Sequence, residues 1–478
     1  MPYVLGIDLG GWHTAAAVSR LAEAASGAGG WTEVEVVPLG VGTSTIPSVL
    51  YVLPDGSIHA GEVGAALAGK GRAVLGFGRR VGDDVPLIID GEPYPGQALL
   101  AALALWVVDR VEEREGDRAQ HIVVTHPGGW GPYRVDLLHR ALWRAGLDTV
   151  TLLPAPVVAA EEYAAEAPVG TGAVFAVQDF GGGESAVVRR TDVGTFELLG
   201  CAGSGVDSDA DGYPGGIEPL LDDALLGYVG EQLRLSFDSL DPTDPSVREG
   251  IGRLREECTA ARELLATATE ASIAVELPSV VTRVPVSRGD LDELVRPLLF
   301  TATDTLRRLV GSCGLASGDL AGVVLAGGAA RAPLVGTLVA AVLPVRVVVG
   351  AHPELRIARG AALAAQRAVD RPMNLPAART GEIVEYAGGY GAHAIDDGPD
   401  GDYDGDYVED SDVQNSVVRP RPRPGNRPRP GYGGAAVERF GGYDDADLGE
   451  PPPRPPVHIT PLELPKRGRR WGRRDRDD

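Results

Sequence analysis

Short apolar runs alternate with longer amphipathic stretches from the first residue to about residue 369. The short runs are rich in Val, Leu and Ala and predict buried strands, whereas the longer stretches have the spacing of helices. Alternation of this kind favours an α/β fold with mixed sheets. The predicted strands are 3–8, 15–19, 121–125, 150–153, 174–179 and 185–190, and the predicted helices are 97–115, 133–145, 247–267, 290–312 and 355–369.

A pattern of strand, glycine turn and second strand at the start of the chain is repeated near its middle. A predicted strand ending at Asp8 runs into a glycine turn and a second strand, and a strand ending at Asp179 does the same. Another buried strand, within 323–349, runs into a third turn. This repetition predicts two similar halves that face a cleft. The first glycine turn contains Gly10 and Gly11, the second contains Gly181, Gly182 and Gly183, and the third contains Gly327 and Gly328.

The composition changes abruptly after residue 370. Residues 371–478 are dominated by Pro, Gly, Asp, Arg and Tyr and have almost no hydrophobic periodicity. Such a segment buries too little apolar surface to offset its ordering entropy, so we expect a disordered tail. The tail separates its charges into an acidic block at 396–412, an Arg-Pro run at 419–430, a proline patch at 451–456 and a basic end at 466–474.

Composition narrows the class of protein. The 478 residues carry a net charge of −23, which argues against a direct nucleic-acid role because phosphate binding needs a concentrated excess of basic residues. Cys201, Cys258 and Cys313 lack the spacing of a disulfide framework or a zinc cluster, and a reducing cytoplasm is the simplest compartment. No uninterrupted apolar stretch of about 18 residues predicts a membrane span.

The glycine turns, in their order and strand context, resemble those of the heat-shock protein 70 family over residues 1–369, where that family has its N-terminal ATPase domain. The resemblance implies an actin-like two-lobed ATPase fold, with duplicated mixed-sheet halves around a nucleotide cleft. It implies one nucleotide-binding domain at 1–370, with lobe I at about 1–168 plus 355–370 and lobe II at about 169–354. The further motifs that carry it are 45–49, 124–127, 144–147, 270–273 and 360–362.

The expected ligands are ATP or ADP with Mg²⁺. Successive N–H groups in a glycine turn form a concave nest for phosphate oxygens, which assigns nucleotide binding to the seven glycines of the three turns. The resemblance places Arg331 on or near the purine and Arg262 on the helix that faces the adenine. Taken alone, Arg331 also fits an exposed arginine at the start of a helix.

Two strand-end carboxylates are the expected metal ligands. By the resemblance, Asp8 and Asp179 would hold Mg²⁺ through its waters, and this ion usually needs only one or two carboxylates besides phosphate. A lone aspartate at a strand end can instead cap the turn that follows it. Their equivalent places in two repeated halves favour the metal role.

Several positions depart from the pattern of the family. Because phosphoryl transfer depends on positioned charges, their loss predicts weak or absent hydrolysis, and we assign no catalytic residue. Each lost hydrogen bond weakens nucleotide binding by about 0.5 to 1.5 kcal/mol without abolishing it. Gly11 and Trp12 replace the two threonines of the first turn, Gly78 replaces a lysine, and Ala155 replaces a glutamate. Glu184 and Ala186 replace the threonine and the distal aspartate of the second turn.

Two functions remain open. The first is a divergent, ATP-binding family member with a chaperone-like role in protein folding or assembly. The second is a non-enzymatic pseudo-ATPase scaffold whose tail recruits unknown protein partners, for which its proline-rich segments are suited. In the family a proline and a glutamate relay the nucleotide state to a peptide-binding domain. Pro127 matches that proline, Ala155 breaks the relay, and no such domain is encoded after residue 370.

A sugar or acetate kinase on the same fold is less well supported, because no distinct motif for a catalytic acid stands out. Hydrolysis by a cysteine or serine nucleophile has no supporting constellation either. His13 and His126 lie near predicted strand ends and lack an obvious nucleophile partner, so we interpret both as structural histidines.

Overall fold

The structure is a computed structural model that describes residues 1–22, 30–67, 69–203, 205 and 216–370. The predicted disordered tail, with its acidic, proline-rich and basic segments, lies outside the described residues. Within the described part, none of the helices is both long enough and apolar enough to cross a bilayer.

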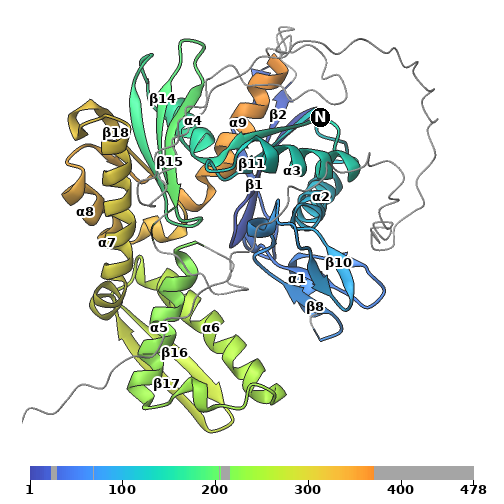
Figure 1. Ribbon diagram of the computed structural model, residues 1–478, viewed down its shortest axis with the longest axis vertical. Helices are drawn as coiled ribbons and strands as arrows, with labels where there is room; N and C mark the ends of the chain where they lie inside the picture. The colour runs from blue at the N-terminus through green and yellow to red at the C-terminus, as the bar shows by residue number, and fades with distance from the viewer. Residues whose placement is uncertain (23–29, 68, 204, 206–215, 371–478) are drawn as a thin grey trace, which may run out of the picture. The chain divides into compact units, whose positions relative to one another are not determined.

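The first sheet is built from strands of the N-terminal part of the chain (Figure 1). Its order is β12-β11-β1-β2-β3, and β4 and β5 also pair with β2. An antiparallel hairpin of β1 and β2 holds the first glycine turn, and β11 and β12 continue the sheet in parallel with β1. These strands are β1 (Tyr3–Leu9), β2 (His13–Ala22), β3 (Gly30–Trp31), β4 (Glu35–Val37), β5 (Thr45–Pro47), β11 (His121–His126) and β12 (Val150–Pro154).

The second sheet repeats this topology in the order β15-β14-β13-β18-β19. Here β13 and β14 form the antiparallel hairpin around the second glycine turn, and β18 and β19 continue the sheet in parallel. The repeated halves predicted from the strand ends at Asp8 and Asp179 are therefore confirmed, and so is the actin-like fold class. The strands are β13 (Val174–Asp179), β14 (Glu184–Arg190), β15 (Phe196–Gly203), β18 (Leu320–Ala326) and β19 (Val347–Val348).

Helices cover both sheets. In the first half, α2 packs on β1. In the second half, α7 packs on β13, β14 and β15. The helix α9, at the end of the described chain, packs on β1, β2 and β11 of the first sheet. Between the sheets, α4 contacts β12 as well as β13, β14, β15 and β18. The helices are α1 (Gly61–Ala66), α2 (Gly96–Glu115), α3 (Pro132–Arg144), α4 (Ala155–Glu166), α5 (Glu218–Leu233), α6 (Pro245–Leu265), α7 (Arg288–Ser312), α8 (Pro333–Val342) and α9 (Arg356–Asp370).

Smaller sheets extend from each half. The strands β6, β7 and β8 form one, β9 and β10 a second, and the hairpin of β16 and β17 packs with α6. Short 3₁₀ turns include η1 (Phe77–Arg80) and η4 (Gly328–Arg331). The strands are β6 (Leu50–Val52), β7 (Ile58–His59), β8 (Arg72–Val74), β9 (Leu87–Ile89), β10 (Glu92–Tyr94), β16 (Glu270–Leu277) and β17 (Val280–Ser287).

Local sequence signals set several helix ends. Ser287 and Asp290 form a capping box at the start of α7, and Asp244 caps α6 by accepting a hydrogen bond from the amide of Ser246. Gly146, with a φ of +92°, follows the end of α3 in the left-handed region that glycine adopts without strain. Gly146 directly follows the predicted helix 133–145, where a glycine commonly ends a helix.

Two glycines let α9 pack backbone to backbone in the core. A Cβ on Gly6 of β1 would lie 2.1 Å from the amide nitrogen of Ala362, and one on Gly360 would lie 1.9 Å from the carbonyl oxygen of Val158 in α4. Since Asp8 is the last residue but one of β1, this packing fixes one wall of the cleft described below.

The Gly360→Ala variant tests this packing. We expect it to lose about 1 to 3 kcal/mol of unfolding free energy or more, because the added methyl would overlap a backbone carbonyl that cannot move alone. Urea unfolding followed by circular dichroism measures the loss. Gly252→Ala is the matched control: Gly252 is exposed inside α6 with open space around its Cβ, so alanine there should stabilise by up to about 1 kcal/mol. Equal behaviour of the two variants would contradict the interpretation.

Candidate functional site

A cavity of about 1090 Å³ lies where the three glycine turns meet. Every residue predicted to bind nucleotide or metal lines it, although these residues are spread over more than 300 positions of the sequence. They are Asp8, Gly10, Gly11, Asp179, Gly181, Gly182, Gly183, Arg262, Gly327, Gly328 and Arg331.

The second and third turns touch through their backbones. Gly327 has a φ of +86°, and a Cβ at this position would lie 2.1 Å from the amide nitrogen of Gly181. Only glycine allows this conformation and this approach together. The contact brings the ends of β13 and β18 to one wall of the cavity.

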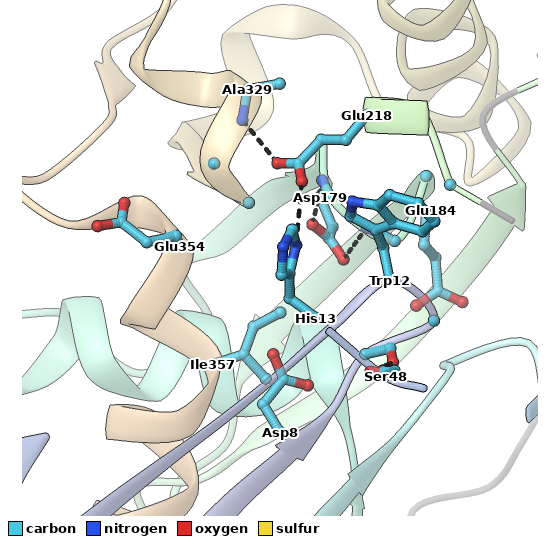
Figure 2. A pocket seen from close by; sticks show the side chains of 18 of the residues that line it. Asp8, Trp12, His13, Ser48, Asp179, Glu184, Glu218, Ala329, Glu354 and Ile357 are labelled. Carbon is cyan, nitrogen blue, oxygen red and sulfur yellow. Dashed lines mark hydrogen bonds and ion pairs between the residues drawn. The ribbon is translucent and has the colours of Figure 1, made fainter. Parts of the chain in front are cut away.

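Asp179 caps its own turn. Its Oδ1 accepts a hydrogen bond from the amide of Gly181 at 2.8 Å, and its Oδ2 accepts one from the amide of Gly182 at 3.0 Å (Figure 2). Asp179 therefore caps the turn that follows it, as one of the two interpretations of this residue predicts. Its side chain also lines the cavity. Burial outweighs the two amide donors and raises the pKa of Asp179 to about 6.

Asp8 enters the same cavity from the first sheet. Its Oδ1 accepts a hydrogen bond from the hydroxyl of Thr125 at 2.8 Å. Burial and the nearby charge of Asp179 together raise the pKa of Asp8 to about 7, against the lowering effect of the hydrogen bond from Thr125. The two carboxylates are therefore close enough to repel each other.

This pair fits a divalent cation. Two buried carboxylates of like charge are stabilised by a cation between them, and hard oxygen ligands suit Mg²⁺. No group of three or more His, Cys, Asp or Glu side chains in the described ranges could hold a metal. Water or phosphate oxygens would therefore complete the coordination of an ion at Asp8 and Asp179.

Glu218, the first residue of α5, links the third turn to the first hairpin. Its Oε1 accepts a hydrogen bond from the amide of Ala329 at 2.9 Å, and its Oε2 lies 3.5 Å from Nδ1 of His13 (Figure 2). Although burial opposes its charge, the hydrogen bond from His13 and the charge of Arg262 lower the pKa of Glu218 to about 2. His13, which the sequence analysis interprets as a structural histidine, lines the cavity beside this carboxylate.

Arg262 is almost fully buried, with 7% of its surface exposed. Its Nε donates a hydrogen bond to Oδ1 of Asp222 at 2.6 Å, and Thr259 donates to the other oxygen of Asp222 at 2.8 Å. The Nη2 of Arg262 is buried and has no acceptor among the described residues. Since buried donors are rarely left unpaired, Nη2 fits a hydrogen bond to a ligand in the cavity.

The positions that depart from the expected pattern fall in two environments. Trp12, Gly78 and Ala155 line the cavity, whereas Ala186 is fully buried in the core beneath the second sheet. An aspartate at position 186 would therefore need a partner that this core does not provide. Lys70, the lysine nearest in the sequence to Gly78, is exposed and does not line the cavity.

Glu184 bridges the two halves. It is the first residue of β14, and its carboxylate accepts hydrogen bonds from the amides of Gly128 and Gly129, both at 2.9 Å, in the loop that follows β11. Burial outweighs these donors and, with the nearby charge of Asp179, raises the pKa of Glu184 to about 7.

Three supporting residues escape prediction from the sequence. Ser48, within the motif 45–49, donates a hydrogen bond from its hydroxyl to the carbonyl of Gly10 at 2.7 Å and so fixes the first turn. Glu218 and His13 meet across the cleft from distant parts of the chain. The only sequence signal for Glu218 is an acidic residue just after the glycine pair 215–216, at the start of a helix.

The Glu218→Gln variant tests the charge of this carboxylate. A carboxylate with a lowered pKa stabilises the fold above its unfolded value, here 4.5, and that stabilisation is lost as the pH falls toward about 2. We expect the variant to lose on the order of 3 kcal/mol at pH 6 and progressively less toward pH 2. Urea unfolding from pH 6 to pH 2 measures the difference, with Glu197→Gln, at a half-buried residue outside the cavity, as control. A pH-independent difference would contradict the charge assignment.

Comparison with known protein families agrees with this geometry. The family model described as Hsp70 protein matches residues 82–374. Among similar curated proteins, the Chaperone protein HscA homolog of Acidithiobacillus ferrooxidans is 27% identical over 356 residues, which is 69% of this chain and 54% of that protein.

Other relatives give the same picture. The Chaperone protein DnaK of Nitrosopumilus maritimus is 25% identical over 381 residues, which is 76% of this chain and 56% of that protein. The Chaperone protein HscA homolog of Burkholderia lata is 31% identical over 280 residues, which is 58% of this chain and 42% of that protein. The chain thus spans about half the length of the curated relatives that it matches.

Proposed function

The chain belongs to the Hsp70 family, and on this premise we propose that it is a divergent, chaperone-like member whose cleft binds ATP or ADP with Mg²⁺. We further propose that it hydrolyses ATP weakly or not at all. The observation that carries the binding proposal is the meeting of three glycine turns, two buried carboxylates and one unpaired buried guanidinium nitrogen in a single cavity.

Each group has a proposed role. The glycine turns present backbone amides to phosphate oxygens, and Asp8 and Asp179 would hold Mg²⁺, which neutralises phosphate charge when it is bound. Arg262 would donate from Nη2 to the adenosine part, and the exposed Arg331 would contact the purine. Because Asp179 already uses the amides of Gly181 and Gly182, a phosphate must share these donors with it or displace it.

The proposal of weak hydrolysis rests on what surrounds the turns. Neither Gly78 nor Ala155 can supply a cation or a carboxylate to a reacting phosphate, and Ala186 is shielded in the core. Loss of one stabilising group typically costs about 10² to 10³ in rate, so the combined loss removes most turnover even if the effects are not additive.

We propose one nucleotide-binding domain at 1–370, with lobe I at about 1–168 plus 355–370 and lobe II at about 169–354. The packing of α9 on the first sheet supports the assignment of the last segment to lobe I. A chaperone-like role in folding or assembly is proposed from the names of the relatives, whose remaining length has no counterpart in the matched part of this chain.

The test combines binding and turnover on the full chain. Titration with ATP and ADP, with Mg²⁺ or with a chelator, should give millimolar or tighter binding that Mg²⁺ strengthens, while phosphate release stays near the buffer background. Turnover comparable to that of chaperone ATPases would contradict weak hydrolysis. Absence of binding at millimolar nucleotide would remove the nucleotide proposal and leave the scaffold alternative.

The Asp8→Asn variant separates binding from stability. Asn keeps an acceptor for Thr125 but removes one of two neighbouring buried charges, so the ligand-free variant should melt at the same temperature as the parent or higher. The strengthening of nucleotide binding by Mg²⁺ should fall about tenfold or more, since a cation loses one of its two carboxylates. Thermal melting and titration at pH 8 measure both effects. Asp192→Asn, exposed and outside the cavity, is the control. A variant that binds Mg²⁺-nucleotide like the parent would contradict the metal role of Asp8.

A further inference from the structure

Glu184 is held in one position at the end of the second turn. It directly follows Gly183, its backbone pairs with Asp179, and both of its carboxylate oxygens accept amide hydrogen bonds from the other half of the molecule. A side chain with both oxygens bonded to backbone cannot swing away without leaving the amides of Gly128 and Gly129 unpaired. The carboxylate is therefore a fixed feature of the cavity wall (Figure 2).

Among the residues that the structure describes, the groups that shift the pKa of Glu184 include two amides and Asp179 but no cationic side chain. A Cβ on Gly128 would lie 3.4 Å from both oxygens of Glu184 and 3.1 Å from Cγ of Pro156, so the carboxylate sits beside the start of α4. Ala155 lines the cavity there and brings no charge. The arginines Arg79 and Arg134 also line the cavity, but their side chains are largely exposed, where solvent screens them.

The proposed roles of the lining residues set the orientation of a nucleotide in the cavity, with its base at one end and its phosphates at the other. Its two arginines assigned to adenosine, Arg262 and Arg331, lie with α6 and the third turn, while its first and second turns carry the carboxylates assigned to Mg²⁺. If the base lies at the arginines and the inner phosphates lie at the turns, the end of the phosphate chain would border the lining residue that directly follows the second turn. That residue is Glu184.

We propose that Glu184 is a specificity-determining residue that makes this cleft select nucleoside diphosphates over nucleoside triphosphates. The inference rests on the proposed nucleotide site and deepens it by naming the ligand class. A diphosphate ends at the turns, whereas a third phosphate brings further negative charge against a carboxylate that cannot move away. Repulsion between like charges a few ångströms apart in a partly water-excluded cleft lowers affinity about tenfold or more.

The experiment measures ADP and a β,γ-methylene analogue of ATP on the full chain, with Mg²⁺ at pH 8, by isothermal titration calorimetry. We expect the parent protein to bind ADP about tenfold or more tightly than the analogue. Glu184→Gln keeps the size of the side chain and an acceptor for one amide, and it should tighten binding of the analogue so that the two affinities agree within about threefold. Its affinity for ADP should change by no more than about twofold.

The matched control is Glu197→Gln on β15, which removes the same charge from a side chain that pairs with Arg189 outside the cavity. It should keep the selectivity of the parent protein. Equal affinities in the parent, or a ratio that Glu184→Gln leaves unchanged, would overturn this inference while the nucleotide site stands. Failure of both proteins to bind either ligand at millimolar concentration would overturn the proposed function and this inference together. A thermal melt of Glu184→Gln confirms that it is folded before titration.

Discussion

The concentration of carboxylates in one cavity is the constraint on which the rest of the site depends. Asp8, Asp179, Glu184 and Glu218 all line it, and each is compensated differently. Asp8 accepts a hydrogen bond from a hydroxyl group, and Asp179 accepts hydrogen bonds from the amides of its own turn. Glu184 accepts hydrogen bonds from amides of the opposite half. Glu218 is stabilised by an amide together with His13 and Arg262. Only the last arrangement lowers a pKa, because only there does a cationic group outweigh burial.

These different ways of compensating the four carboxylates explain how the cavity can keep its shape without a ligand and still contain groups that a ligand would stabilise. Glu218 joins the third turn to the first hairpin and fixes the geometry of the walls without any ligand. Burial disfavours the charged forms of Asp8 and Asp179, and repulsion from Asp179 adds to this at Asp8, whereas repulsion from Glu218 adds to it at Asp179. A bound cation would relieve these effects. In the ligand-free protein the charged forms of these two carboxylates are therefore less stable than in water, a cost that proteins commonly carry at functional sites.

Features set by short stretches of sequence could be predicted, whereas contacts between distant segments of the chain could not. Strands ending in Asp8 and Asp179 and the glycine turns after them are short patterns, and the repeated topology follows from them. Glu218 was missed because its partners, Ala329 and His13, lie in other segments of the chain. Ala186 shows the opposite failure, since matching to a motif placed it at the site while the pleat of β14 turns it into the core. The metal role of Asp179 stays a prediction, because its carboxylate caps its own turn and lines the cavity at once.

The replacements around the turns are best understood as one change in the distribution of charge. The expected pattern places a glutamate on the first half, at position 155, and a neutral hydroxyl on the second, at position 184. This chain has Ala155 and Glu184 instead, so the carboxylate has moved from the start of α4 to the start of β14. In its new place the carboxylate bonds amides of the loop after Pro127 and joins the second turn to the first half by direct contact. A group whose two oxygens are occupied in this way suits holding the halves together better than activating a water molecule, since a general base needs a free lone pair aimed at the proton that it removes. Taken together, the two replacements leave position 155 without a carboxylate and add one at position 184 that connects the two halves.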